Sequence, residues 1–274
     1  MSFIHLRTSS AFSLKYGTTQ PRDLVERAAQ FESPALALTD RDGLSGAIRF
    51  ASACLEFGIA PIIGVNLAID LLADPNIKSA STKNLPRVTV LAHGDGGWRA
   101  LVRLLSGLNM NAADRTPILT LDLLQRFSQY STQLHLLHGP ESPVSQALTL
   151  HRSDIALEIF NKTRPFFGDH AIDCVSHLVA GKRPFSTAHA ARSLIFARDH
   201  DIDAVITNAV RMRDAADGPV ADILDCARQL VPLHQRHLER RNAQGYLKSN
   251  DEMVSLAAEI ARAAGERTPR ELLQ

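Results

Sequence analysis

Residues 35–66 read ALALTDRDGLSGAIRFASACLEFGIAPIIGVN and place a helical segment between two apolar runs. The runs 35–40 and 60–66 are short, rich in small or branched apolar residues and end on polar residues, which predicts two buried strands. The segment 43–58 between them has helical spacing and stops at Gly58, a residue typical of helix C-termini. This stretch therefore predicts a strand, a helix and a second strand in sequence.

The same alternation continues on both sides of this unit. Further apolar runs that predict strands are 3–10, 87–95, 133–140, 171–178 and 203–209. Helical spacing is found in 18–31, where Thr19 is a candidate cap and Pro21 lies in the first turn, and in 96–109, 142–163 and 186–201. Alternating strands and helices predict an α/β protein with a parallel sheet. Because no Gly-x-Gly-x-x-Gly turn follows the first run, a barrel is favoured over a dinucleotide-binding open sheet.

Two segments interrupt the alternation. Residues 71–87 form a polar stretch punctuated by prolines, which predicts a loop, a hairpin or an insertion. From Pro219 onward the chain is helical, then basic, then amphipathic. We therefore predict a barrel domain over residues 1–218 and a helical extension over residues 219–274.

The composition is that of an ordinary soluble globular protein. Of the 274 residues, 45% are apolar and 22% are charged, and the net charge of +1 gives no general indication of nucleic-acid binding. Cys54, Cys174 and Cys226 are far apart and form no Cys-x-x-Cys pair, so the sequence indicates neither a zinc knuckle nor a disulfide framework. The sequence has neither a secretory leader nor an apolar run long enough to span a bilayer, so a cytoplasmic protein without membrane contact is expected.

Polar residues follow the predicted strands, and in a parallel sheet they should gather at one rim. These residues are Arg7, Ser9, Asp40, Arg41, Asn66, His93, His138, Asp173, His177, Asn208 and Arg211. A hydrolytic metal site needs imidazoles and carboxylates that converge on the ion. Guanidinium groups have no lone pair to give, and three of them would repel a cation. The rim therefore argues against a metal centre.

Five stretches, in this order and spacing, resemble the PHP (polymerase and histidinol phosphatase) domain of bacterial DNA polymerase III alpha subunits and error-prone DNA polymerases. They are FIHLRTSSAFSLKYG (3–17), ALALTDRDGLSGAIRFASAC (35–54), GIAPIIGVNLAI (58–69), VITNAVRM (205–212) and RNAQGYLKSNDEM (241–253). The resemblance implies a distorted, seven-stranded (β/α)7 TIM-like barrel. It also implies metal-dependent phosphoesterase activity where the metal ligands are intact.

Most ligand positions of that family carry other residues in this chain. By the resemblance, the former metal positions are Arg7, Ser9, Tyr16, Asp40, Arg41, Asn66, Pro140, Ala209 and Arg211. Only Asp40 clearly retains a ligand residue, and His93 or His138 is left open as a second remnant. Losing so many ligands removes a metal site. We therefore expect no catalytic residues and no metal cofactor. The expected function is a pseudoenzyme module related to a polymerase alpha subunit in DNA replication or translesion synthesis, with the polymerase palm and thumb or replication proteins as partners. The chain ends before the polymerase carboxylates would come, so it is either one domain of a longer polymerase or a free-standing relative.

Two alternatives remain open. One is a phosphoesterase with a rearranged zinc or manganese site built from Asp40, His93, His138 and Asp173. The other is a phosphate- or sulfate-binding protein in which Arg7, Arg41 and Arg211 pair with Asp40 and attract an anion. That reading requires the arginines to lie within about 8 Å of one another, roughly a Debye length.

Two further groups of residues have a structural interpretation. The histidines are expected to be core residues rather than a metal cluster; they are His93, His135, His138, His170 and His177. The basic stretch 234–241 predicts a solvated helix face with at most a weak DNA contact.

Overall fold

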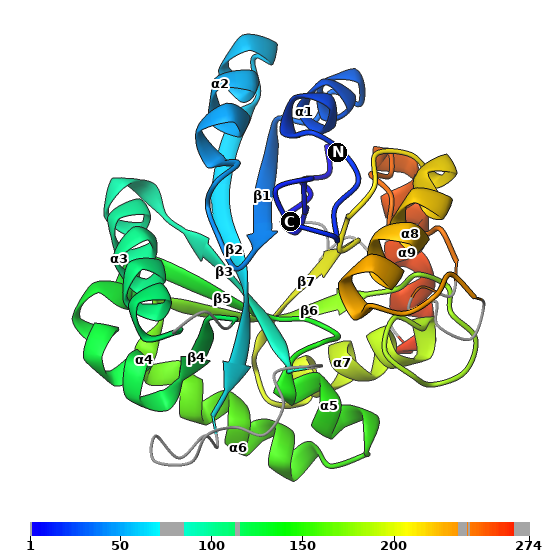
Figure 1. Cartoon of the computed structure of the whole chain (residues 1–274). Helices are drawn as coiled ribbons and strands as arrows, with labels where there is room; N and C mark the ends of the chain where they lie inside the picture. Colours follow the sequence, from blue (N-terminus) through cyan, green and yellow to red (C-terminus); the bar gives the residue numbers. More distant parts are fainter. Residues whose placement is uncertain (1, 72–84, 113–115, 235–239, 241, 266–274) are drawn as a thin grey trace.

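The computed structural model describes residues 2–71, 85–112, 116–234, 240 and 242–265, and they form a curled sheet with helices around its outside (Figure 1). Along the sheet, the strands are β1 (Ala35–Arg41), β2 (Ala60–Asp70), β3 (Arg87–Ala92), β5 (Leu134–His138), β6 (Asp169–Val175) and β7 (Asp203–Thr207). The short strand β4 (Ile118–Thr120) pairs with β2 off this path. The predicted α/β class is confirmed, and β4 is a strand that the apolar pattern did not indicate.

The direction of β3 corrects the prediction of a parallel sheet. The β1–β2, β2–β4, β5–β6 and β6–β7 pairs are parallel, but β3 is antiparallel to both β2 and β5. The apolar pattern of a buried strand has no direction, so the sequence did not distinguish β3 from its neighbours. As a result, the amino end of β3 lies at the rim where the parallel strands end.

The first predicted strand, residues 3–10, is not a regular strand. It makes two isolated parallel bridges, from His5 to Leu36 and from Thr8 to Val210. The backbone N–H of Ala37 donates to the carbonyl of His5 at 2.9 Å, and that of Val210 donates to Arg7 at 2.9 Å. This segment therefore links β1 to the chain that follows β7. The sheet is curled, and a closed barrel of seven regular strands is not confirmed.

Nine α-helices lie in the described residues. They are α1 (Pro21–Gln30), α2 (Ala47–Phe57), α3 (Gly94–Ala112), α4 (Leu121–Phe127), α5 (Pro143–Thr149), α6 (Ser153–Thr163), α7 (Thr187–Asp199), α8 (Gly218–Gln229) and α9 (Asn250–Ala263). Short 3₁₀ helices are η1 (Ser128–Gln133), η2 (Arg164–Phe166) and η3 (Ala215–Asp217).

The helix ends test three details of the sequence analysis. Gly58 ends α2 in the left-handed conformation with a φ of 71°, as predicted. The N-cap of α1 is Gln20 without a side-chain bond, and the hydroxyl of Thr19 instead accepts from the N–H of Arg213 at 3.0 Å. The predicted helix 142–163 is divided into α5 and α6.

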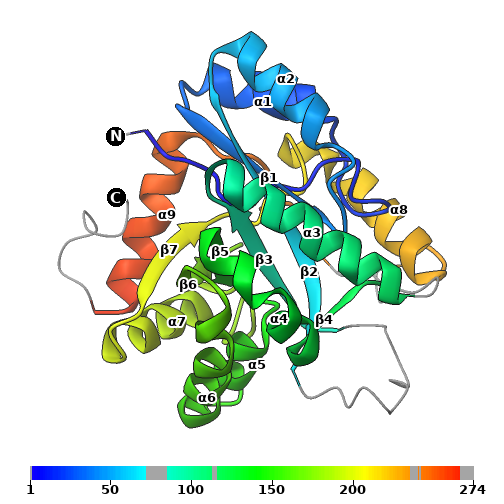
Figure 2. The ribbon, with the colours of Figure 1, turned by 90° about the vertical axis from the view of Figure 1, so that its left-hand side faces the viewer.

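The core has three apolar layers under the helices and a small one inside the curl. One outer layer joins β6 and β7 to α5, α6, α7 and α9, a second joins β2, β3 and β5 to α3 and α4, and a third joins β1 to α1 and α2. Figure 2 shows α9 and α7 beside β7, so part of the predicted extension 219–274 packs into the same core as the predicted barrel. The inner layer is made of Ala37, Leu91, Leu137 and Ala171.

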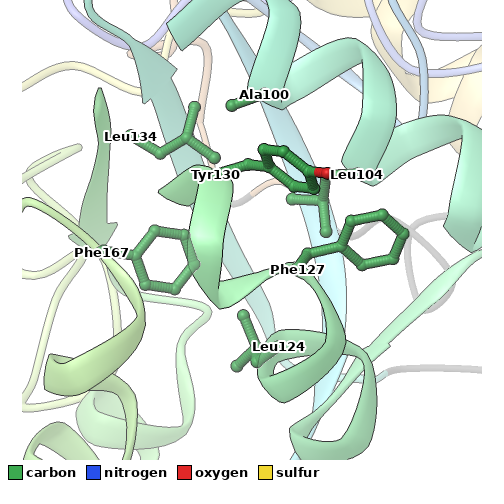
Figure 3. A pocket seen from close by; sticks show the side chains of 7 residues that line it. All are labelled: Ala100, Leu104, Leu124, Phe127, Tyr130, Leu134 and Phe167. Carbon is green, nitrogen blue, oxygen red and sulfur yellow. The ribbon is translucent and has the colours of Figure 1, made fainter. Parts of the chain in front are cut away.

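A small cavity between α3, α4 and η1 is not a candidate site. The cavity in Figure 3, between α3, α4 and η1, measures about 10 Å³ and has an almost wholly apolar lining that includes Leu104, Phe127 and Phe167. Such a space offers a water few polar partners.

The polar stretch 71–87 and the basic stretch 234–241 fall mostly outside the described residues. No helix within the described ranges combines the length and apolar character needed to cross a membrane.

Candidate functional site

A cavity of about 220 Å³ opens at the rim where β1, β6 and β7 end. Its lining residues are Tyr16, Arg41, Glu141, His177, Val179, Arg183, Pro184, Phe185, Ala209, Arg211, Arg240 and Asn242. Four of these residues are arginines, and one is a carboxylate. The predicted rim is thus present, but its charged members include residues that the sequence analysis did not single out.

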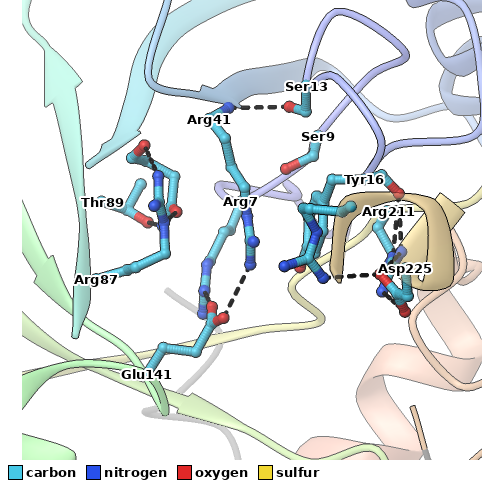
Figure 4. Close-up of polar contacts among 12 residues, drawn as sticks. Arg7, Ser9, Ser13, Tyr16, Arg41, Arg87, Thr89, Glu141, Arg211 and Asp225 are labelled. Atoms are coloured by element: carbon cyan, nitrogen blue, oxygen red, sulfur yellow. Dashed lines mark hydrogen bonds and ion pairs between the residues drawn. The ribbon is translucent and has the colours of Figure 1, made fainter. Parts of the chain in front are cut away.

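Glu141 binds two of the predicted arginines at the centre of this rim (Figure 4). Arg7 forms an ion pair with one carboxylate oxygen, and Nη2 of Arg41 lies 2.9 Å from the other. Burial alone would raise the pKa of Glu141, but Arg41, Arg7 and Arg87 outweigh it and lower the pKa to about 2. The carboxylate is therefore ionised and shared between guanidinium groups.

Arg7 also reaches a second acid inside the curl of the sheet. Its Nη1 lies 3.4 Å from Oδ2 of Asp173 on β6. Gly139 makes room for this pair, because a Cβ there would lie 2.6 Å from Nη1 of Arg7 and 2.9 Å from the carboxylate. Burial raises the pKa of Asp173, and the charge of Arg7 opposes that rise. The Arg7 side chain is only 7% exposed, so these contacts fix it in one place.

The ring of Tyr16 lies between two guanidinium groups. The Cζ atoms of Arg41 and Arg211 lie 3.4 and 4.1 Å from the ring centroid, so the two cations are within about 8 Å of each other, where salt screens them little. Arg211 is bound at 3.0 and 2.9 Å by both oxygens of Asp225 on α8. It also donates to the backbone carbonyl of Tyr16 at 2.9 Å. Arg41 and Arg211 therefore lie within the distance that the arginine hypothesis requires.

Asp40 has different neighbours from those expected. It accepts the N–H of Ser10 at 2.7 Å and the hydroxyls of Ser10 and Ser13 at 2.9 and 2.7 Å. Burial raises its pKa, and these serine hydrogen bonds oppose the rise. The acids that pair with Arg7, Arg41 and Arg211 in the contacts described above are Glu141, Asp173 and Asp225, whereas the predicted partner was Asp40. The short side chains of Ser10 and Ser13 reach Asp40 because the chain turns beside it at the end of the first predicted strand.

Asn66 binds an arginine that the sequence analysis missed. Its Oδ1 accepts from Nε of Arg87 at 2.6 Å, and Nη2 of the same guanidinium pairs with Asp42 at 2.7 Å. Arg87 begins β3, and the reversed direction of this strand brings it to the rim. A former ligand position, in the resemblance, thus serves as an acceptor for a fixed cation.

The remaining residues at former metal positions contribute backbone and shape. The N–H of Ser9 donates to the carbonyl of Val210 at 2.8 Å, and Pro140 is buried just after β5. Ala209 lines the cavity with a φ of 44°, a left-handed conformation that is costly for a residue with a Cβ.

The histidines lie in three separate places. His93 and His135 lie at the ends of the strands away from the cavity, with ring centroids 5.6 Å apart. His93 is there because β3 is reversed. His138 and His170 lie on the helix-covered face, 5.8 Å apart. His177 lines the cavity, and its Nε2 bonds the carbonyl of Asn208 at 2.7 Å. The alternative metal set, Asp40, His93, His138 and Asp173, is therefore not brought together. Of these residues, Asp173 is the one that pairs with a rim arginine, Arg7.

The donor set of the rim does not fit a zinc or manganese centre. No group of three or more His, Cys, Asp or Glu side chains in the described ranges could hold an ion. The groups that converge in the cavity are guanidinium groups, which have no lone pair for a metal.

Several charged residues of the site were missed from the sequence, and three of them show why. Glu141 directly follows Pro140, and an acid at the end of a strand was the signal that could have identified it. Asp225 lies on the buried face of α8 beside Ala221 and Cys226, so helical periodicity places it inward. Arg87 gave no such signal, because only the antiparallel pairing of β3 explains its position.

Comparisons with known proteins were made against this geometry. A family model described as PHP domain matches residues 5–177. The DNA polymerase III subunit alpha of Escherichia coli is 29% identical over 267 residues, which cover 95% of this chain and 22% of that protein. The error-prone DNA polymerase of Symbiobacterium thermophilum is 29% identical over 279 residues, covering 96% of this chain and 24% of that one. The chain thus spans less than a quarter of the length of these relatives.

A solved structure also resembles this fold. It is an amidohydrolase from Chromobacterium violaceum with bound sulfate and no metal, with a TM-score of 0.51 and 14% sequence identity. The match covers 77% of this chain and 88% of that one. At this identity the likeness concerns the fold alone.

Proposed function

The chain belongs to the PHP domain family, and from this we propose that it is a PHP domain without a metal centre that acts as a structural or interaction module of a DNA polymerase III alpha-like protein. Its sequence similarity to polymerase alpha subunits and error-prone polymerases supports that context. We infer that the curled sheet corresponds to the distorted seven-unit barrel of the family. The proposal places the chain in the cytoplasm with the replication proteins.

The observation that carries the proposal is the binding of Arg7 and Arg41 to one carboxylate, Glu141. By the resemblance, both arginines stand where metal ligands would be. A divalent ion among these guanidinium groups would meet strong repulsion in a partly buried site. Fixed cations, neutralised by protein carboxylates, take the place of a bound cation.

The same contacts support a structural role. Arg7 belongs to the segment that links β1 to the chain after β7, Arg41 ends β1, Glu141 follows β5, and Asp173 lies on β6. The network therefore ties four parts of the sheet together across its open end. Buried ion pairs of this kind are strongly destabilising to break, which gives a reason to retain the network where catalysis is absent.

Metal analysis and a hydrolysis assay test the first half of the proposal. The purified chain is incubated with Zn²⁺ or Mn²⁺, desalted and analysed for metal, and p-nitrophenyl phosphate hydrolysis is measured on the same sample. We expect far less than one ion per chain and no hydrolysis above the rate in buffer. Stoichiometric metal together with turnover would establish the phosphoesterase alternative instead.

A binding assay tests the second half. The chain is titrated with the DNA polymerase III alpha subunit of its own organism, and association is followed by sedimentation velocity. Saturable association supports an interaction module. Two species that sediment independently at micromolar concentrations would contradict that role.

A further inference from the structure

A second group of polar side chains lies at the ends of the strands away from the cavity. His93 follows β3, His135 lies near the start of β5, and Asp169 begins β6. Because β3 is antiparallel to β5, its carboxyl end meets the amino ends of β5 and β6 there. None of these three residues lines the cavity, and they have no part in the proposed function.

The pairing of β3 with β5 places the two histidines on one side of the sheet. In this antiparallel pair, Leu91 is opposite His135. The backbone N–H of His93 donates to the carbonyl of Gln133 at 2.9 Å, so the pairing continues past the end of β3. His93 comes two residues after Leu91, and residues two apart on a strand point to the same face. The two imidazole rings are therefore diagonal neighbours, with centroids 5.6 Å apart.

This separation suits two imidazoles that share one ion. A zinc–nitrogen bond is about 2.0 to 2.1 Å long, so the centroids of two imidazoles on one tetrahedral ion lie roughly 5 to 6 Å apart. The His135 side chain is 32% exposed, and an ion can reach it from solvent. His93 is exposed, so its ring can turn to present a nitrogen to the same ion.

Asp169 holds His135 in the form that binds a metal. Oδ2 of Asp169 lies 3.0 Å from Nδ1 of His135. In the neutral ring this contact makes Nδ1 the protonated nitrogen and leaves the lone pair on Nε2. Histidine ligands in metalloproteins commonly donate their other ring nitrogen to a carboxylate in this way, which fixes the tautomer and the orientation of the ring.

The charged side chains around the two histidines differ from those at the rim. Asp95, in the first turn of α3, comes two residues after His93. Arg99, one turn further along this helix, donates to the backbone carbonyl of Asp95 at 3.2 Å. Together with Asp169, this gives two carboxylates and one guanidinium group. A cation here therefore does not meet the excess of guanidinium groups that it would meet in the cavity.

We propose that His93 and His135 form a binding site for a divalent ion that prefers imidazole nitrogen, namely Zn²⁺, with Asp169 as a positioning residue. Two imidazoles leave coordination positions for water, so the ion exchanges with solvent and is removed by desalting. The site lies at the other end of the strands from the arginine rim. It therefore leaves the proposed absence of a metal centre at the rim unaffected.

Isothermal titration of the whole chain with Zn²⁺, without desalting, tests the proposal. We expect His93→Ala and His135→Ala each to weaken zinc binding by more than about tenfold, because one imidazole ligand is lost. Asp169→Ala should weaken it by about tenfold, since the loss of a carboxylate that orients a metal-bound imidazole typically costs about 10- to 100-fold in affinity. Asp169→Asn should recover part of that loss, because the amide oxygen still accepts from Nδ1 of His135.

The matched control is His151→Ala, which removes an exposed histidine between α5 and α6 and should leave the zinc affinity unchanged. Urea unfolding checks that each variant is folded. With Cu²⁺ in place of Zn²⁺, electron paramagnetic resonance should show two nitrogen ligands in the parent and one in either histidine variant. Absence of zinc binding by the parent, or binding that His93→Ala and His135→Ala leave intact, would overturn the proposal.

The outcomes separate this inference from the proposed function. Hydrolysis of p-nitrophenyl phosphate is measured on the titrated samples. Zinc binding that His93→Ala weakens, without hydrolysis in any sample, supports both proposals. Zinc binding that His93→Ala weakens, with hydrolysis that the same variant retains, supports this site and refutes the metal-free rim. Absence of both zinc binding and hydrolysis refutes this site alone.

Discussion

Glu141 is half-buried in the cavity and His138 is buried on the opposite, helix-covered face, and their charge states differ. Burial alone would raise the pKa of Glu141, but three arginines lower it to about 2, so the group stays ionised. Burial lowers the pKa of His138 to about 3, and the neighbouring His170 adds to this, so the ring stays neutral. The difference shows that burial favours the neutral form unless opposite charges outweigh it.

This difference also distinguishes the two clusters chemically, because one is charged and the other is neutral. The cavity keeps charged side chains that are fixed by ion pairs. The histidine pair packs against Phe160, with ring centroids 5.3 Å apart for both histidines. Nδ1 of His138 is buried without a hydrogen-bond partner among the described residues. These two rings pack in the core as predicted, but His93 is exposed and His135 lies partly exposed beside Asp169, which corrects the prediction for that pair.

Removing the shared acid should have the largest effect. Glu141→Gln leaves the charges of Arg7 and Arg41 without their common counter-ion, and breaking a buried pair in this way costs about 3 to 5 kcal/mol. The Glu141 side chain is 26% exposed, so we expect a loss near the lower end, about 3 kcal/mol. The free energy of unfolding in urea measures it.

Glu158→Gln is the matched control for this prediction. Glu158 pairs with Lys162 on α6, at side-chain exposures of 64% and 40%, and an exposed pair contributes less than about 1 kcal/mol. If both variants lost the same small amount of stability, the Glu141 network would not be the fixed structure that we describe.

The histidine side of the comparison is tested by pH. Because its native pKa is lowered to about 3, His138 binds a proton more readily in the unfolded chain. Its contribution to stability is complete above the unfolded value of 6.5 and is lost as the pH falls toward 3. At pH 5 the loss relative to pH 7 is about 2 kcal/mol. His138→Leu should reduce the acid loss of the whole protein by this amount.

The variant keeps its neighbours satisfied, because the Thr163 hydroxyl also donates to the carbonyl of Phe160 at 2.9 Å. Urea unfolding at pH 7 and pH 5 gives the measurement, and His151→Asn, at an exposed position, is the control. Glu141 titrates in a lower window, from 4.5 down to about 2, so it remains ionised in both experiments. An unchanged pH 7 to pH 5 difference in His138→Leu would mean that this ring is not neutral in the native state.

The sequence predicted the positions of the strands and helices better than the directions of the strands. The pattern in 35–66 predicted β1, α2 and β2 with Gly58 at the helix end, and all are present. Reversal of β3 could not be predicted, because an apolar run reads the same in either direction. Because β3 is reversed, His93 lies at the strand ends away from the cavity, and Arg87 lies at the rim.

The site could be predicted in position but not in pairing. Arg7, Arg41 and Arg211 were expected to be neighbours, and they are joined through Glu141 and Tyr16. Which acid binds which arginine depends on turns of the chain that have no periodic signal. Strand alternation would have separated His138 from the cavity, because its neighbour Leu137 faces the interior layer.

The smallest predicted effect concerns the ring that holds two cations in the cavity. Tyr16→Leu removes the aromatic face between Arg41 and Arg211, which then repel each other across an apolar side chain, and a cation–π contact at a partly exposed site contributes about 1 kcal/mol. Tyr16→Phe keeps the face and should retain the stability of the parent. Urea unfolding of the two variants measures the difference. Equal stability of both would mean that the acids alone hold the arginines in place.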